Sequence, residues 1–173
     1  LAAWTFLPDR TGTGPLLAAA GLLNFARLAR WAGWRTLRDP LVLVLHVAYV
    51  FVPAGLLVSA LGALFPDAVP PAAGIHLFGV GAIGSMTLAV MTRATLGHTG
   101  RELRADPATC LIFVAIVLAA PLRLAAVFMP DATALLHVSA TLWVAAFLGY
   151  AVRYGGMLSR PRAAPRQPNR APA

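Results

Sequence analysis

Apolar residues along the chain come in long blocks separated by short polar turns, and no stretch shows sustained alternation of polar and apolar positions. A helix that crosses the hydrocarbon core of a bilayer needs about 20 mostly apolar residues. Blocks that approach or exceed this length span residues 15–31, 41–65, 72–96, 108–129 and 132–150. The first is the weakest, because Asn24 and Arg27 interrupt it. The pattern predicts an all-α fold, a polytopic transmembrane bundle of about five spanning helices.

Helix-start signals stand at the block boundaries. Asp39 and Asp106 each precede a proline, so each offers a capping carboxylate before a residue suited to the first helical position. We expect Asp131 to cap the last helix in the same way. Pro53 and Pro121 lie inside blocks and predict kinks. The connections between blocks are short, so consecutive helices are expected to be antiparallel neighbours.

The two ends of the chain differ from the blocks. Residues 1–7 form an apolar stub with no initiator Met and no charged segment before it, so we expect the end of a preceding helix. The missing N-terminal helices of the same protein are then expected partners. The tail is rich in Pro, Arg and Ala and is predicted to be disordered. The expected organisation is a helix end and outer loop at 1–14, a five-helix transmembrane region at 15–155, and a disordered cytoplasmic tail at 156–173.

Composition agrees with a membrane protein and excludes a soluble globular domain. Apolar residues make up 59% of the chain and charged residues 12%, against about 45–50% and about 25% in soluble domains. The single cysteine, Cys110, excludes a disulfide framework within the chain and is interpreted as a packing residue, with a role as a metal ligand as the alternative.

All 14 basic residues are arginine. When the chain is followed back and forth across the membrane, only Arg10 and Arg123 fall on one side. The other side receives Arg27, Arg30, Arg35, Arg38, Arg93, Arg101, Arg104, Arg153, Arg160, Arg162, Arg166 and Arg170. The positive-inside rule makes that side cytoplasmic, together with the C-terminus. No nucleic-acid motif accompanies the net charge of +8, so the expected partner of these arginines is membrane lipid and not nucleic acid.

The candidate metal ligands are the four histidines, because ionisable residues in membrane helices are costly and commonly functional. His46 and His98 are expected near the cytoplasmic side, whereas His76 and His137 are expected near the outer side. Depth therefore predicts an outer pair, His76 with His137, and an inner pair, His46 with His98. On a regular helix His76 and His98 would share a face, within about 40° of each other. The alternative is that each histidine is only an interfacial hydrogen-bonding residue.

Arg93 and Arg123 are candidate cofactor-binding residues, since each lies about one turn inside a helix. They either extend to the membrane surface or pair with an anionic cofactor group such as a haem propionate. Gly81, Ser85 and Ala89 repeat at four-residue spacing. Small residues at this spacing favour close helix packing, and an alternative is room for a flat cofactor.

The stretch from His76 to Arg101, which ends in His98-Thr99-Gly100-Arg101, resembles the NnrS family. The segments at residues 27–31, 35–36, 39–41 and 45–46 resemble it as well, so that the similarity spans most of residues 16–150. The resemblance implies a bacterial inner-membrane protein that contains haem and copper and is associated with nitric oxide metabolism and resistance. It implies metal binding in general and no ligand role for any single histidine.

The resulting hypothesis is a haem- and copper-binding membrane protein that protects against nitric oxide or related nitrosative chemistry. Imidazole suits both metals. One alternative is a transporter or channel-like protein whose histidines relay protons, and another is a structural or assembly subunit. Only the first requires a Soret band. Whether the protein catalyses a reaction stays open.

Overall fold

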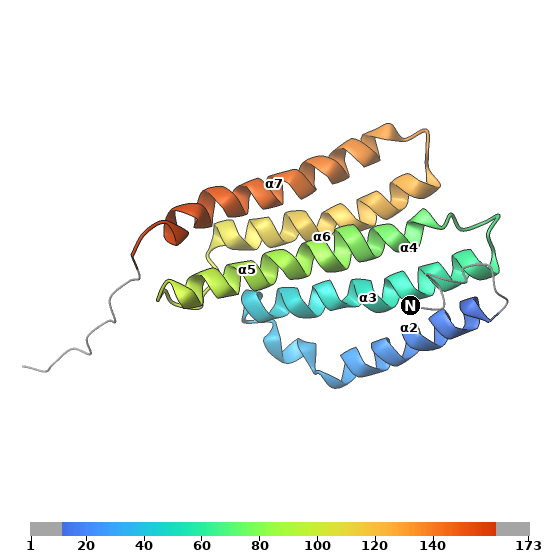
Figure 1. Ribbon diagram of the computed structural model, residues 1–173, viewed down its shortest axis with the longest axis horizontal. Helices are drawn as coiled ribbons and strands as arrows, with labels where there is room; N and C mark the ends of the chain where they lie inside the picture. Colours follow the sequence, from blue (N-terminus) through green and yellow to red (C-terminus); the bar gives the residue numbers. More distant parts are fainter. Residues whose placement is uncertain (1–11, 162–173) are drawn as a thin grey trace, which may run out of the picture.

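The computed structural model describes residues 12–161, and every regular element in that range is helical (Figure 1). The long helices are α2 (Thr13–Arg30), α3 (Pro40–Leu64), α6 (Pro107–Phe128), α7 (Thr133–Leu158), and a continuous helix made of α4 (Ala72–His76), η2 (Leu77–Ile83) and α5 (Gly84–His98). A short 3₁₀ turn, η1 (Gly33–Thr36), joins α2 to α3. Neighbouring long helices run antiparallel, as the short connections predicted.

Four helices are long and apolar enough to cross a membrane: α3, the continuous helix Ala72–His98, α6 and α7. The α2 helix has 18 residues but does not reach this composition, because Asn24, Arg27 and Arg30 lower its hydropathy. The all-helical membrane fold is thus confirmed with four spanning helices, and the crossing of α2 as a fifth stays a prediction.

Two of the three predicted caps are confirmed. The Asp39 carboxylate accepts a hydrogen bond from the Leu41 amide at 3.0 Å, and that of Asp106 accepts one from the Thr109 amide at 2.8 Å. The prediction for Asp131 is wrong, because α7 begins at Thr133 with Ala132 as its N-cap and without a side-chain cap. The Ala132 amide bonds to the Met129 carbonyl at 2.9 Å, which leaves Asp131 inside the preceding turn.

Pro53 and Pro121 lie inside α3 and α6, as expected. Each lacks the amide hydrogen that would bond to the preceding turn, so each interrupts the backbone ladder of its helix. Both helices nevertheless continue past their proline to full spanning length. The kinks themselves stay a prediction.

The small residues of the continuous helix serve close packing, as the sequence favoured. Gly81, Ser85 and Ala89 are all buried. A Cβ atom at Gly81 would lie 2.6 Å from Cγ of Phe51 on α3, so the space beside this backbone is filled by a side chain. The alternative of room for a flat cofactor along this stripe is therefore not supported.

The middle of the same helix is a π-helical segment, η2, whose turns are wider than those of an α-helix. This segment separates His76 from His98. The expectation that the two histidines share a face assumed a regular α-helix throughout, so the angle on which it rested does not apply, and the shared face stays a prediction. His76 is half-buried, whereas His98 is exposed.

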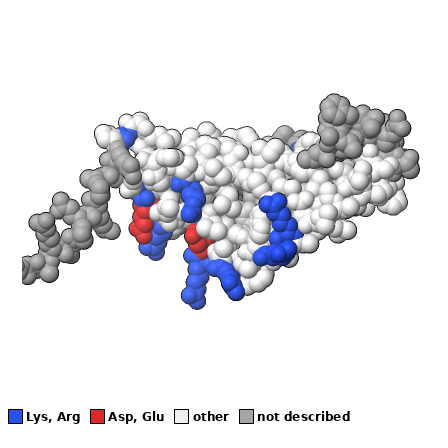
Figure 2. Space-filling view, turned by 60° about the horizontal axis from the view of Figure 1, so that its bottom comes forward, with Lys and Arg blue, Asp and Glu red and all other residues white. Residues whose placement is uncertain are grey.

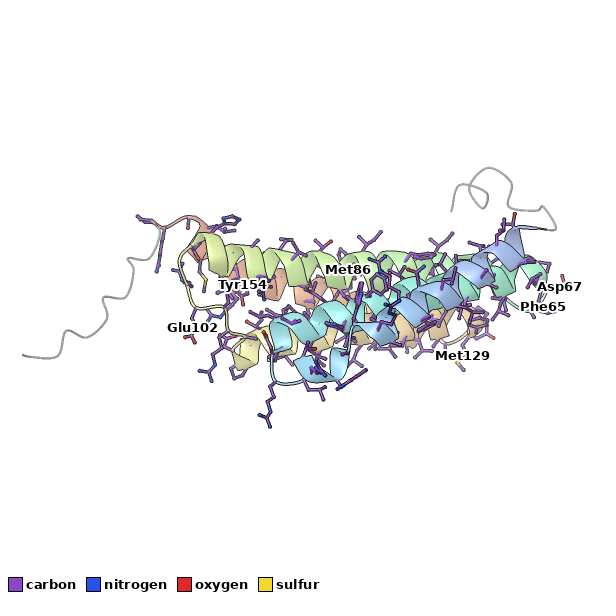
Figure 3. The ribbon with its side chains drawn as sticks, turned by 90° about the horizontal axis from the view of Figure 1, so that it is seen from below. Phe65, Asp67, Met86, Glu102, Met129 and Tyr154 are labelled. Atoms are coloured by element: carbon purple, nitrogen blue, oxygen red, sulfur yellow. The ribbon has the colours of Figure 1, made fainter. Side chains whose placement is uncertain are left out.

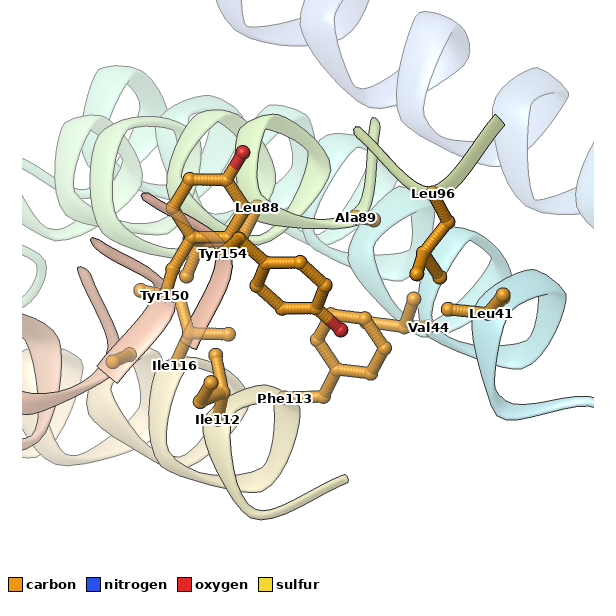
Figure 4. Close-up of a cluster of buried hydrophobic side chains, with 11 residues drawn as sticks. Leu41, Val44, Leu88, Ala89, Leu96, Ile112, Phe113, Ile116, Tyr150 and Tyr154 are labelled. Atoms are coloured by element: carbon orange, nitrogen blue, oxygen red, sulfur yellow. The ribbon is translucent and has the colours of Figure 1, made fainter. Parts of the chain in front are cut away.

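The largest buried cluster lies where α3, α5, α6 and α7 meet (Figure 4). It contains Leu41, Val44, Leu88, Ala89, Leu96, Ile112, Phe113, Ile116, Ala146, Tyr150 and Tyr154. A smaller cluster of Leu17, Leu56 and Ala60 joins α2 to α3. The helix α2 therefore packs on α3 at one edge of the bundle, outside the main core (Figure 1).

The bundle has two chemically different ends. Figure 3 places Glu102 and Tyr154 at one end and Phe65, Asp67 and Met129 at the other. The first, here called the arginine-rich end, holds the C-termini of α5 and α7 and the N-termini of α3 and α6, and α2 runs toward it but ends partway along α3 (Figure 1). Every arginine of residues 12–161 except Arg123 lies in or near it, and Figure 2 shows these side chains gathered over part of the molecule. The predicted helix stub, Arg10 and most of the predicted tail lie outside the described residues.

Candidate functional site

His46 lies in the second turn of α3, near the arginine-rich end, and its side chain is half-buried. Its ring Nδ1 lies 3.1 Å from the carbonyl oxygen of Val42. A carbonyl oxygen can only accept a hydrogen bond, so Nδ1 carries the hydrogen. The neutral imidazole then has its lone pair on Nε2, which is the arrangement of a histidine prepared to bind a metal.

The aromatic ring of Trp31, the residue directly after α2, packs against this ring. The Trp31 ring meets His46 edge to face at 6.1 Å and lies 4.7 Å from the ring of Tyr49. The Tyr49 hydroxyl donates a 2.6 Å hydrogen bond to Oδ1 of Asn24, and the guanidinium of Arg27 lies over Trp31 at 5.1 Å. We call these five residues the His46 cluster.

The His46 cluster explains why the first apolar block is weak. Asn24 and Arg27, which interrupt the block, are the residues through which α2 contacts Trp31 and Tyr49. Asn24 also bonds to the Ala20 carbonyl at 2.8 Å, so its amide is satisfied on both sides. Sequence reasoning did not find this cluster, although the polar residues inside an apolar block were its signal.

His76 lies at the opposite end of the bundle, at the last residue of α4. It is half-buried and lies within electrostatic range of Arg123 on α6. Arg123 lines a cavity of about 220 Å³ together with Ser139 and Trp143 of α7. The structure thus brings together one predicted ligand and one predicted cofactor-binding residue from different helices.

The other predicted site residues are exposed. His98 is the last residue of α5, His137 lies in the second turn of α7, and Arg93 lies on α5, with all three side chains facing away from the core. Within residues 12–161 no three His, Cys, Asp or Glu side chains come close enough to hold a metal ion together. The assignment of the histidines to an inner and an outer pair stays a prediction.

A second polar group, which sequence reasoning missed, joins α6 to α7 at the arginine-rich end. Arg153 donates to Oδ2 of Asp106 from Nε at 3.0 Å and from Nη2 at 2.6 Å. The Thr109 hydroxyl donates to Oδ1 of Asp106 at 2.6 Å and lies 2.5 Å from the Tyr154 hydroxyl. The hydrogen bonds from Thr109 and Arg153 lower the pKa of Asp106 to about 2, so its carboxylate stays charged at neutral pH.

This polar group continues toward α5. The ring of Tyr150 stacks on that of Tyr154 at 5.1 Å, and its hydroxyl is 2.8 Å from the Thr95 hydroxyl. Farther along the same buried face of α5, the hydroxyls of Thr92 and Ser85 have no hydrogen-bond partner within residues 12–161. Two tyrosines one turn apart in a membrane helix were the available sequence signal.

Among the comparisons with known proteins, the family comparison gives a match. A family model described as NnrS protein matches residues 1–162 of the 173-residue chain. No curated protein and no solved structure matches. Since the family match covers nearly the whole chain and includes all four histidines, this membrane protein belongs to the NnrS family of nitric oxide-related proteins.

Proposed function

We propose that this protein binds haem and copper in the bacterial inner membrane and acts in nitric oxide metabolism or in resistance to nitrosative stress, with its C-terminus in the cytoplasm. The observation that carries the proposal is the His46 ring, whose Nδ1 hydrogen is committed to the Val42 carbonyl. Membership of the NnrS family supports the link to nitric oxide.

The residues fit haem better than they fit a copper ion held by the described part of the chain. Haem iron can be held by a single imidazole in an apolar surrounding, and bound haem would supply a site for nitric oxide. The His46 ring lies against Trp31, which in turn packs on Tyr49. A copper site draws on several imidazole or thiolate donors, and residues 12–161 bring no three such donors together.

Copper would then depend on exposed histidines that combine with donors outside residues 12–161. His98 and His137 have the required exposure, since both face away from the core. Their exposure also fits contact with further helices or with lipid. Lipid is a further expected partner, because four helices have the composition of membrane spans.

The anionic groups of a cofactor need a cationic partner, and the geometry favours Arg123 over Arg93. Arg123 is half-buried, lines a cavity and lies within electrostatic range of His76, and its guanidinium can hold a carboxylate through two hydrogen bonds. Arg93 is exposed, and its long side chain can reach the membrane surface from its position near the end of α5.

An absorption spectrum and metal analysis test the proposal against the alternatives. The protein, expressed from its complete gene and purified in detergent, should show a Soret band and contain iron and copper. The Soret band should shift when nitric oxide is added to the reduced protein. A colourless, metal-free preparation that still fluxes protons in vesicles would replace the proposal with a proton-relaying transporter.

A further inference from the structure

The arginine-rich end contains a cavity of about 520 Å³ that the proposed haem site does not use. It lies between the end of α5, the connection from residue 99 to residue 106, and the last turns of α7. Its charged and polar lining residues are Arg101, Glu102, Arg104, Asp106, Arg153 and Tyr154. Figure 3 shows Glu102 and Tyr154 at the same end of the bundle.

The His-Thr-Gly-Arg sequence places Arg101 at this cavity by ending α5 sharply. The Arg101 amide bonds to the Leu96 carbonyl at 2.9 Å, and the Gly100 amide bonds to that of Gly97 at 3.2 Å. These are the two hydrogen bonds of a Schellman motif, which requires a left-handed residue after the helix. Gly100 supplies it with a φ of 72°. The turn directs the chain from α5 toward α6 and brings Arg101 to the lining of the cavity.

The charges around the cavity do not cancel. Asp106 is fully engaged, because one oxygen accepts from Thr109 and the other from Arg153. This leaves Glu102 as the remaining carboxylate of the lining against the guanidinium groups of Arg101 and Arg104. Within residues 12–161 no ion pair joins Glu102 to either arginine. The cavity therefore has an excess of positive charge.

Arg101 gives the strongest sign of a ligand. Its Nη1 atom is buried and has no hydrogen-bond partner within residues 12–161. A buried donor of a charged group without an acceptor is costly, and native structures rarely retain one without a functional reason. An anion with several oxygen acceptors in the cavity would satisfy Nη1 of Arg101.

We propose that this cavity binds a phosphate group, presented either by an anionic phospholipid headgroup or by a soluble phosphate. Guanidinium groups match the oxygens of phosphate through paired, charge-assisted hydrogen bonds. The apolar walls formed by Leu96 and Met157 suit the glycerol and upper acyl part of a lipid. The cavity lies at the end of four spanning helices, where lipid phosphates are found.

Native mass spectrometry of the purified protein, with short-chain phosphatidylglycerol, phosphatidylcholine and inorganic phosphate as separate probes, tests the proposal. Phosphatidylglycerol should bind, and Arg101→Gln should weaken its affinity by about tenfold or more. Arg38→Gln is the matched control, because Arg38 is an exposed arginine at the same end that does not line the cavity. It removes the same charge and should leave the affinity within about twofold.

Glu102→Gln tests the proposal through a gain in affinity, which a loss of folding cannot imitate. It removes the unpaired carboxylate from the lining and should increase the affinity for phosphatidylglycerol by a few-fold. Inorganic phosphate that binds at least as tightly, with the same dependence on Arg101, would identify soluble phosphate as the source of the group. Equal binding of phosphatidylglycerol by wild type, Arg101→Gln and Arg38→Gln would overturn the proposal, as would equal binding of phosphatidylcholine.

Discussion

The orientation of the His46 ring depends on neighbouring residues that are not themselves candidate ligands. Its Nδ1 is committed to the Val42 carbonyl, and the Cδ2 edge of the ring faces Gly33 in η1. A Cβ atom at Gly33 would lie 3.0 Å from Cδ2 of His46. A side chain at Gly33 would therefore press on the ring, so the glycine permits the present orientation of His46.

We expect Gly33→Ala to displace the His46 ring by a few tenths of an ångström and to weaken haem retention. The measurement is the fraction of haem lost to an excess of apomyoglobin over time, which should rise about two- to tenfold, because small misplacements of a ligand are costly. Gly155→Ala is the control, since nothing lies within 4 Å of a Cβ atom there. Equal rates of haem loss in the two variants would show that Gly33 does not support the ring.

Asp106 combines two roles that substitutions can separate. It caps α6 through the Thr109 amide and pairs with Arg153 on α7. Asp106→Asn keeps a capping side chain but loses the ion pair, which is partly exposed and contributes little. Asp106→Ala loses both, and it should destabilise the protein by about 1 kcal/mol more than Asp106→Asn. The melting temperatures of the two variants in detergent measure this difference.

The pH dependence of Asp106 follows from its lowered pKa. The folded pKa is about 2 and the ordinary value is 3.8. Because the shift is downward, the stabilisation is fully present above pH 3.8 and is lost as the pH falls toward 2. The difference in melting temperature between wild type and Asp106→Asn should therefore be constant from pH 7 to about 5 and shrink below about 4. A difference that grows on acidification would contradict the assignment.

At the scale of elements, the apolar blocks predicted the positions of the helices well. Blocks 41–65 and 108–129 became α3 and α6 with shifts of one residue, because Asp39 and Asp106 cap them and Pro40 and Pro107 begin them. The last block was predicted to end at Tyr150, but α7 continues to Leu158. Its added turns carry Arg153 and Tyr154, which pair with α6 and so extend the helix beyond its apolar part.

The π-helical segment was not predictable from hydropathy, because apolar residues continue through it without a break. It lies where the continuous helix packs closely on α3: Gly81 lies against Phe51, and Gly55 of α3 lies against Phe78. For the same reason the relative orientation of His76 and His98 could not be derived from sequence. The His46 cluster was similarly hidden, since it depends on how α2 crosses α3.

Gly81 and Gly79 offer a matched test of this packing. A Cβ atom at Gly81 would lie 2.6 Å from Phe51, whereas nothing lies within 4 Å of one at Gly79. Gly81→Ala should destabilise the protein by about 1–3 kcal/mol through overpacking. Gly79→Ala should be neutral or slightly stabilising. Equal changes in melting temperature in the two variants would contradict a specific effect of the contact between Gly81 and Phe51.

In the whole molecule, the arginines of residues 12–161 are distributed unequally between the two ends of the bundle. The positive-inside rule then predicts that the arginine-rich end faces the cytoplasm. A reporter fused after Gly156 should be active if it works in the cytoplasm and inactive if it needs the periplasm. Activity of a periplasmic reporter at this position would reverse the proposed orientation.

The same reporters can decide whether α2 crosses the membrane. Placed in the connection at residues 66–71 they report the outer end of α3, and placed directly before Thr13 they report the start of α2. The same side at both positions indicates that α2 spans, as the short turn at η1 favours. Opposite sides would leave α2 lying along the surface at the edge of the bundle.

The Soret band of the purified protein tests whether His46 holds haem in this member of the NnrS family. The Soret absorbance per protein should be compared in wild type, His46→Ala and Thr87→Ala, where Thr87 is an exposed residue of α5 that is not part of the His46 cluster. We predict a Soret band in wild type and Thr87→Ala, and its loss or a marked shift in a folded His46→Ala protein. An unchanged Soret band in folded His46→Ala would show that His46 is not a haem ligand.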